Sequence, residues 1–366
     1  MIQNYNQEFN VKSRSIFIEL TSVLFLLIVP LTLFLLVKLD LLNRALADGV
    51  ALSFFLLFCL NRLGFIVISF MVAFITSFHI LLSGAYLHIL NFSILPIAAL
   101  TFSSPLISKN TLYKVIPILV IYTFLMTLFD FITGAFVEAG DRIAGPFTSS
   151  LHLAYFLVIL AVVTLSSNLK TKIPLIIMLI IAAAISGSRV GLVGCLVCFL
   201  AMFNNANFKI KFGIIIILII VSFTSLVELL PSRGLSYHAE AEAVRFYGWV
   251  RFYEYLISMD IFQALIGNGR LNYGAVGYRF IGELAFITES SFIMLLYSYG
   301  LPAGLIMASL IIYRFINLQG VSLLVRLMLV GFFMVSPFID SPAIFIINMA
   351  LISSSFPASY NSSRAR

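Results

Sequence analysis

Residues 174–203 read PLIIMLIIAAAISGSRVGLVGCLVCFLAMF, two apolar runs joined by the short polar turn SGSR. Runs of this kind are typical of two helices that meet at a turn in a membrane. Gly187 and Gly191 form a small-xxx-small pattern, which lets membrane helices approach closely. Arg189 would lie at the outer end of this turn. An arginine there faces a wet cavity or a charged partner, or it snorkels to the interface.

The whole chain has the composition of a membrane protein. Its 366 residues are 61% hydrophobic and only 10% charged, with a mean hydropathy of +1.11, whereas soluble proteins carry about 25% charged residues. The apolar segments leave no room for a separate soluble domain of usual size, so residues 1–366 are predicted to form one integral membrane domain. The first apolar run is followed by no cleavage site and is interpreted as the first span.

Apolar runs along the chain predict an all-α polytopic fold with about twelve transmembrane helices. The predicted spans are residues 16–37, 49–60, 63–81, 86–107, 115–134, 149–167, 173–186, 190–203, 212–230, 289–313, 321–336 and 342–356. Residues 231–288, between the ninth and tenth spans, are predicted to form one large, partly helical outer loop. The shortest runs would need tilt or a polar cavity to cross the membrane.

The placement of charge predicts the orientation in the membrane. With both termini in the cytoplasm, most Lys and Arg residues fall in short cytoplasmic loops, as the positive-inside rule requires. Apart from Glu8 and Glu19, the acidic residues gather in or beside the outward segments. The net charge of +7 is therefore interpreted as a topology signal. It gives no support for a nucleic-acid partner.

The outward basic residues are mostly arginine. Of nine such residues, eight are arginine and only Lys38 is lysine. A guanidinium stays charged and binds phosphate or carboxylate through two parallel hydrogen bonds, which an ammonium does not do. This bias indicates an anionic ligand on the outer face. The alternative is that these arginines pair with outward acids and hold the loops together.

Further polar groups flank the outer ends of the predicted spans. In GDRIAGPFTSSLHLAYF (140–156), Asp141 and Arg142 precede a Gly-Pro turn, and His152 is interpreted as a packing residue of the next span. In the long loop, HAEAEAVRFYGWVRFYEYLISMD (238–260) predicts an amphipathic helix whose aromatic face suits the membrane interface. Glu289 opens the tenth span, where the helix dipole alone could also account for an acid.

The order of these motifs resembles the O-antigen polymerase and ligase superfamily. The resemblance runs through R-x-x-G-P-F before a span, G-S-R-x-G, a long outer loop with R-x-x-x-W and G-N-G, and a span containing Y-x-Y-G-L. It covers about Asp141 to Leu305 and implies an integral membrane glycosyltransferase of the GT-C type. Ligases of the superfamily usually have His-Asn at the start of the span after the loop. This chain has Glu289-Ser290 there, which favours the polymerase branch.

The resemblance also implies a substrate and a location. The substrates would be undecaprenyl-diphosphate-linked oligosaccharides, polymerised at the periplasmic face of the bacterial inner membrane in lipopolysaccharide O-antigen biosynthesis. The growing chain would move from its lipid carrier to the nonreducing end of a newly flipped repeat unit. Membrane lipids are expected partners, and a chain-length regulator and a flippase of the same membrane are further ones that the resemblance allows.

The chemistry of such a transfer assigns roles to the arginines. The bond that breaks joins an anomeric carbon to a diphosphate, so negative charge grows on the departing lipid, and fixed cations stabilise the transition state. The predicted diphosphate ligands are Arg189 and Arg142, with Arg245 or Arg251 of the loop helix as further contacts. No cofactor or metal is expected, because the sequence has no dense acidic or histidine cluster.

The attacking sugar hydroxyl needs a general base and a surface that holds the sugar rings. Glu289 is the first candidate for the base and Asp141 the second, and Glu283 is a third acid close in sequence. Trp249 and Tyr253 are predicted to stack on sugar rings, although anchoring at the membrane interface explains Trp249 equally well. The long loop would act as a lid that excludes water.

Two other functions remain open. A ligase that transfers polymer to lipid A-core would use similar arginines and a different acceptor. A lipid-linked oligosaccharide flippase or another transporter would explain the many spans and the arginines facing a cavity. Against a transporter, the two halves of the sequence show no internal repeat, and the long loop lies on one side only.

Overall fold

A computed structural model of the chain describes about half of its residues, and within them the chain is mostly helical. The described residues are 23–42, 50, 107–134, 137–138, 142–147, 149–203, 249–250, 252–267, 290–335 and 342–353. Two strands of two residues each, β1 (Val137–Glu138) and β2 (Arg142–Ile143), pair antiparallel in the segment that joins two helices. The sequence did not predict this strand pair.

The helices of the described residues range from 5 to 26 residues in length. They are η1 (Leu24–Ile28, a π-helical turn), α2 (Val29–Lys38), α6 (Lys109–Thr133), α7 (Ser150–Ser166), α8 (Lys172–Ile185), α9 (Arg189–Met202), α12 (Ile261–Ile266), α14 (Ser291–Ile316), α15 (Leu323–Val335) and α16 (Pro342–Ser353). Residues 252–258 are also helical. By length and composition, α6 and α14 are long and apolar enough to cross a membrane, but only α6 is continuous, because α14 is interrupted at Gly300.

Eight of the twelve predicted spans contain these helices, so their helical character is confirmed. The other four predicted spans, 49–60, 63–81, 86–107 and 212–230, lie almost entirely outside the described residues, as does most of the loop 231–288. The arrangement of twelve spans in a membrane therefore stays a prediction.

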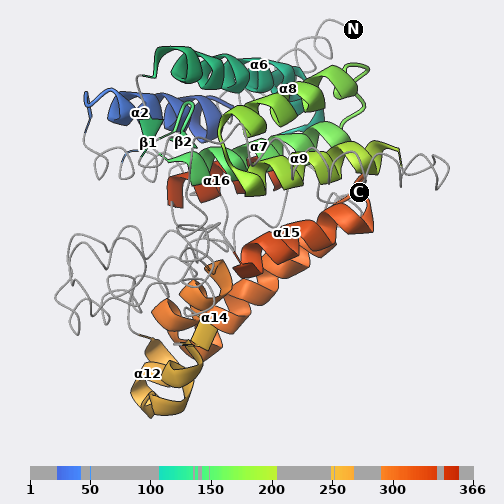
Figure 1. Ribbon diagram of the computed structural model, residues 1–366. Coiled ribbons are helices and arrows are strands. Elements are labelled where there is room, and N and C mark those ends of the chain that lie inside the picture. Colours follow the sequence, from blue (N-terminus) through green and yellow to red (C-terminus); the bar gives the residue numbers. More distant parts are fainter. Residues whose placement is uncertain are drawn as a thin grey trace, which may run out of the picture.

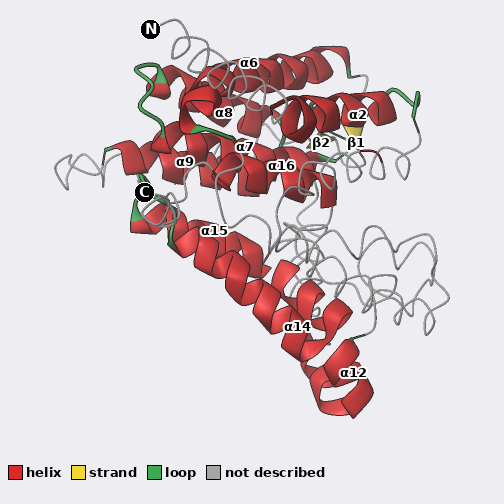
Figure 2. Ribbon diagram, turned by 180° about the vertical axis from the view of Figure 1, so that it is seen from behind, coloured by secondary structure: helices red, strands yellow, loops and turns green. Residues whose placement is uncertain are grey.

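The helix α7 lies at the centre of the structure. It packs against α6, α8, α9 and α16, and fifteen of its seventeen residues are buried. A helix that is apolar on all sides belongs in the interior of a helical group. The helices α14 and α15, with α12, extend diagonally away from this group in both views (Figures 1 and 2).

Two glycines bring α9 close to α7. A Cβ atom at Gly191 would lie 3.3 Å from the Cα atom of Ala154, and one at Gly194 would overlap the side chain of Val158. The later glycine of α9 contacts the later residue of α7, so the two helices run parallel and begin at the same end. The predicted close approach is confirmed at Gly191, whereas Gly187 lies in the turn between α8 and α9.

This packing predicts the effect of Gly194→Ala. The added methyl group would overlap Val158 and lie 3.1 Å from the ring of Phe332, and overpacking of this kind costs about 1–3 kcal/mol. We expect a lower midpoint of thermal unfolding in detergent, and we expect Val158→Ala to restore part of it in the double variant. A double variant in which the two losses simply add would contradict the contact.

The helix α14 is divided at Gly300. The backbone there has φ 78° and ψ 168°, a region open essentially to glycine alone. A Cβ atom at Gly304 would lie 2.7 Å from the carbonyl oxygen of Leu295, although residues so far apart in a continuous helix lie about 13 Å apart along its axis. The two halves therefore fold back on each other with Gly300 at the tip. The prediction of one uninterrupted span over 289–313 is wrong in this respect.

The end of α12 docks against the tip of this helical hairpin. A Cβ atom at Gly267 would lie 2.6 Å from the carbonyl oxygen of Ser298, and one at Gly300 would lie 2.5 Å from that of Leu265. Only backbones without side chains can approach so closely. The G-N-G and Y-x-Y-G-L motifs, which are far apart in the sequence, thus contact each other directly.

Candidate functional site

Several helices begin or end on one side of the structure. Besides the starts of α7 and α9, this side holds the end of α6, because Gly145, in the turn before α7, packs on Thr127. The end of α15 is there too, since Phe332 lies beside α9. The start of α14 joins them, because the hydroxyl of Ser290 donates a hydrogen bond to the carbonyl of Met334. Segments from distant parts of the sequence therefore meet here.

Three helices begin on this side with a serine N-cap. The hydroxyl oxygens of Ser149, Ser188 and Ser290 accept hydrogen bonds from backbone N–H groups in the first turns of α7, α9 and α14. Each cap satisfies a donor that the helix cannot pair internally. The positive ends of the α7 and α9 dipoles thus face the same side, which favours an anion there. The first half of α14 also begins here, but it runs in the opposite direction, so its dipole does not add to theirs. We call this side the capped end, after these three serines.

Arg189 is the first residue of α9 and lies at the capped end. It directly follows the cap Ser188, and its side chain is exposed. The predicted place of Arg189 at the turn between two helices is confirmed, and the side of the membrane on which this turn lies stays a prediction. The guanidinium of Arg189 adds a permanent positive charge to the helix N-termini, so the residue is well placed to bind an anion.

The backbone of Arg142 lies on the same side. Arg142 pairs with Glu138 in the strand pair β1–β2, and the chain then turns at Gly145, where φ is +56°. A Cβ atom at Gly145 would lie 2.8 Å from the hydroxyl oxygen of Thr127. Phe147 ends the turn, fully buried and edge-on to Phe156 of α7, with the ring centroids 5.1 Å apart. This segment is therefore fastened to both α6 and α7.

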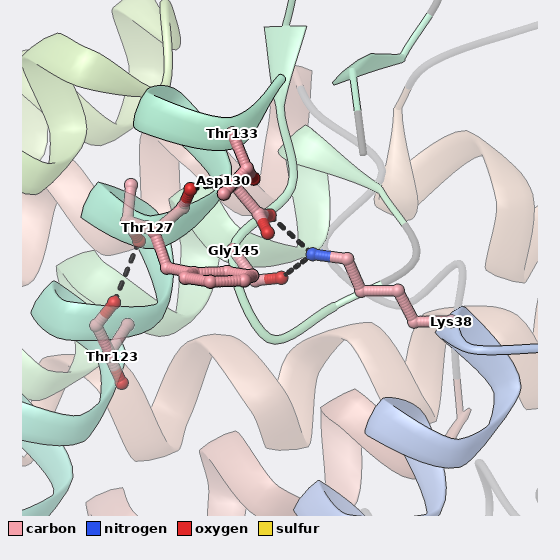
Figure 3. A network of polar contacts seen from close by, with 7 residues as sticks. Lys38, Thr123, Thr127, Asp130, Thr133 and Gly145 are labelled. Atoms are coloured by element: carbon pink, nitrogen blue, oxygen red, sulfur yellow. Dashed lines mark hydrogen bonds and ion pairs between the residues drawn. The ribbon is translucent and has the colours of Figure 1, made fainter. Parts of the chain in front are cut away.

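A buried ion pair fastens the same turn to a third helix (Figure 3). Lys38, the last residue of α2, forms an ion pair with Asp130 of α6 and donates a hydrogen bond to the carbonyl of Gly145. The two charged side chains are 3% and 0% exposed. Sequence reasoning noted Lys38 as the only outward lysine but gave no role to Asp130. An acid inside an otherwise apolar run was the signal that could have identified it.

Aromatic side chains join the loop helix to the first half of α14. The ring of Trp249 stacks on Phe292 with centroids 6.5 Å apart, and Tyr255 contacts Tyr297 at 4.8 Å. Tyr253 lies one helical turn beyond Trp249. The side chain of Tyr253 is 64% exposed and that of Trp249 is 37% exposed. The predicted sugar-binding pair thus offers accessible ring surface, with Trp249 beside the first turn of α14.

Several predicted site residues lie outside the described part of the chain. They are Asp141, Arg245, Arg251, Glu283 and Glu289. Glu289 directly precedes Ser290, so its neighbour in the chain lies at the capped end. His152 is buried in the first turn of α7, as expected of a packing residue. Within the described ranges, no three His, Cys, Asp or Glu side chains gather as metal ligands would.

Comparisons with known proteins do not assign the chain to a family. No protein-family model, no curated protein and no solved structure matches it. The functional argument therefore rests on the residues themselves and on their arrangement.

Proposed function

We propose that this protein is a multi-pass membrane glycosyltransferase that polymerises undecaprenyl-diphosphate-linked oligosaccharide repeat units, an O-antigen polymerase of the bacterial inner membrane. The observation that supports it most is the composition of the capped end. The N-termini of α7 and α9, Arg189 and the turn that carries Arg142 occur together on one side of an apolar helical group. Such an arrangement favours a polyanionic ligand attached to a lipid.

The capped end suits the departure of a lipid diphosphate. As the bond from the anomeric carbon to the diphosphate breaks, its electron pair stays on the diphosphate oxygen. Arg189 and Arg142, with Arg245 or Arg251, bind this growing charge. The N-termini of α7 and α9 add fixed dipoles that need no reorganisation during the reaction. The arginines hold the donor in place through bidentate hydrogen bonds.

The acceptor sugar is bound on the α14 side of the capped end. Glu289 takes the proton from its attacking hydroxyl, and Asp141 is the second candidate for this base. The exposed rings of Trp249, beside the first turn of α14, and of Tyr253 stack on the sugar. The hydroxyl oxygen then attacks the anomeric carbon of the donor, and one new glycosidic bond replaces the bond to the diphosphate.

The membrane arrangement follows from composition and charge. The capped end faces the periplasm and both termini lie in the cytoplasm, because the lysine-rich loops belong on the cytoplasmic side. The exposed apolar side chains of α6, among them Ile118 and Ile132 at 67% and 72% exposure, then face lipid. The carrier lipid reaches the capped end from the same leaflet.

One observation favours the transporter alternative. Helices broken near the middle are common in transporters, where the ends of half-helices face the transported ligand. The fold-back of α14 at Gly300 is such a break. A flippase for a lipid-linked oligosaccharide is therefore the second candidate function, and a ligase acting on lipid A-core is the third.

Purified protein in detergent with a synthetic undecaprenyl-diphosphate repeat unit as its only substrate tests the proposal. A ladder of polymer lengths on a gel, formed with or without a chelator of divalent metals, is the expected result. Transfer of preformed polymer to lipid A-core without a ladder would identify a ligase. Movement of the lipid-linked unit across a vesicle membrane, with no new glycosidic bond, would identify a transporter.

A further inference from the structure

The ion pair between Lys38 and Asp130 is unusual in its burial. Both side chains lie in an apolar environment, where a charge is costly unless it is paired and hydrogen-bonded. Well-packed hydrophobic side chains often replace such a pair without loss of stability. The free energy of folding alone therefore gives no reason for a lysine and an aspartate at these two positions.

Asp130 depends on Lys38 for its charge compensation. The hydroxyl of Thr127 donates to the carbonyl of Thr123 at 2.7 Å (Figure 3). The hydroxyl of Thr123 donates to the carbonyl of Leu119 at 2.7 Å, so both hydroxyls are engaged within α6. The Oδ1 atom of Asp130 has no hydrogen-bond partner among the described residues. Its other oxygen, Oδ2, contacts the ammonium of Lys38.

The ammonium of Lys38 makes a second contact, and this one lies outside α6. It donates to the carbonyl of Gly145, which follows Arg142 by three residues (Figure 3). Asp130 thus holds the ammonium at the point where it binds the turn. The pair ties the ends of α2 and α6 to the backbone that carries a predicted diphosphate ligand.

The turn is anchored on both sides of Gly145, whose carbonyl is held by Lys38. Gly145 has a left-handed backbone, and a Cβ atom added to it would lie 3.2 Å from the side chain of Leu153. The ring of Phe147 is fully buried. The strand pair with Glu138 fixes the other side of Arg142. Loss of the Lys38 contact would remove the hydrogen bond that holds the carbonyl of Gly145 between these two anchors.

We propose that Lys38 and Asp130 are positioning residues that hold the Arg142 segment where its guanidinium meets the diphosphate of the donor. This inference rests on the proposed function. The ion pair acts through the backbone of Gly145, because the side chains of Lys38 and Asp130 are too buried to contact the substrate themselves.

The test separates positioning from folding through a hydrophobic replacement of the whole pair. Either Lys38→Met or Asp130→Leu alone leaves a buried charge without a partner and is expected to lower the yield of folded protein. The double variant Lys38→Met/Asp130→Leu should keep the yield and the unfolding midpoint. Its rate of ladder formation should nevertheless fall roughly tenfold or more, because small misplacements of a binding group slow catalysis strongly.

Combining the Lys38→Met/Asp130→Leu replacement with Arg142→Ala or with Arg189→Ala shows whether its effect on substrate binding depends on Arg142. In Arg142→Ala, the double replacement should weaken the binding of undecaprenyl diphosphate no further, because the positioned group is already absent. In Arg189→Ala, it should weaken binding by the same factor as in the wild type. Equal factors in both backgrounds, or a double variant with wild-type kinetics and binding, would overturn the proposal.

A measurement that needs no activity keeps the inference separate from the proposed function. A nitroxide attached at Arg142→Cys, with Cys59, Cys195 and Cys198 replaced by alanine, should be immobile with the ion pair and more mobile with the Met/Leu pair. A label at Lys170→Cys is the control and should not change. Unchanged mobility at position 142 would refute positioning. A changed mobility without any ladder in the wild type would refute only the polymerase.

Discussion

The Gly300→Ala variant is expected to lose most of its folded protein. Its backbone conformation is open essentially to glycine alone, and the added methyl group would lie 2.5 Å from the carbonyl oxygen of Leu265. Strain and overpacking together cost roughly 2–6 kcal/mol, a large part of a total stability of about 5–15 kcal/mol. The midpoint of thermal unfolding in detergent and the yield of monodisperse protein measure this loss.

Gly331→Ala is the matched control for this experiment. Gly331 lies inside α15, and a Cβ atom there meets nothing within 4 Å. Alanine is favoured over glycine inside a helix by about 0.5–1 kcal/mol, so this variant should unfold at the same temperature or slightly higher. If Gly300→Ala and Gly331→Ala unfold alike, the helical hairpin at Gly300 is not the fold of α14.

The Arg189→Ala variant is expected to fold normally and to lose polymer formation. The side chain is exposed, so its removal leaves the packing of α9 intact. Removal of a fixed charge that stabilises a transition state costs about 100-fold to 1,000-fold in rate. The measurement is the initial rate of ladder formation from the lipid-linked repeat unit, at equal amounts of folded protein.

Two control variants define what is lost. Arg189→Lys keeps the charge but not the planar fork, and it should retain more activity than alanine and less than the wild type. Lys170→Ala removes a positive charge from an exposed position at the opposite end of α7, and it should leave the rate unchanged. Equal losses in Arg189→Ala and Lys170→Ala would mean that overall charge, and not the capped end, matters.

The apolar runs predicted the helices well because burial in a bundle depends on composition over many residues. The runs at 149–167 and 173–186 correspond to α7 and α8 within one or two residues at each end. The break in α14 could not be predicted, because Gly300 lies in a run that is apolar on both sides. Its positive φ becomes necessary only through the approach of Gly267 and the fold-back at Gly304, which are tertiary contacts.

The candidate site was predictable only in part. Arg189 was identified because a charge between two apolar runs is conspicuous in any single sequence. Asp130 was not, because the reason for its burial is Lys38, 92 residues earlier in the chain. Sequence spacing carries no information on such a pair when each member lies at the end of a different helix.

The stoichiometry of the reaction tests the central claim most directly. With the purified wild-type protein and one lipid-linked repeat unit, we would count the undecaprenyl diphosphate released and the glycosidic bonds formed in the same sample. A polymerase that uses the capped end for the departing diphosphate releases one lipid diphosphate for each new bond. Release without bond formation, or neither product while the lipid moves across a vesicle membrane, would contradict the account.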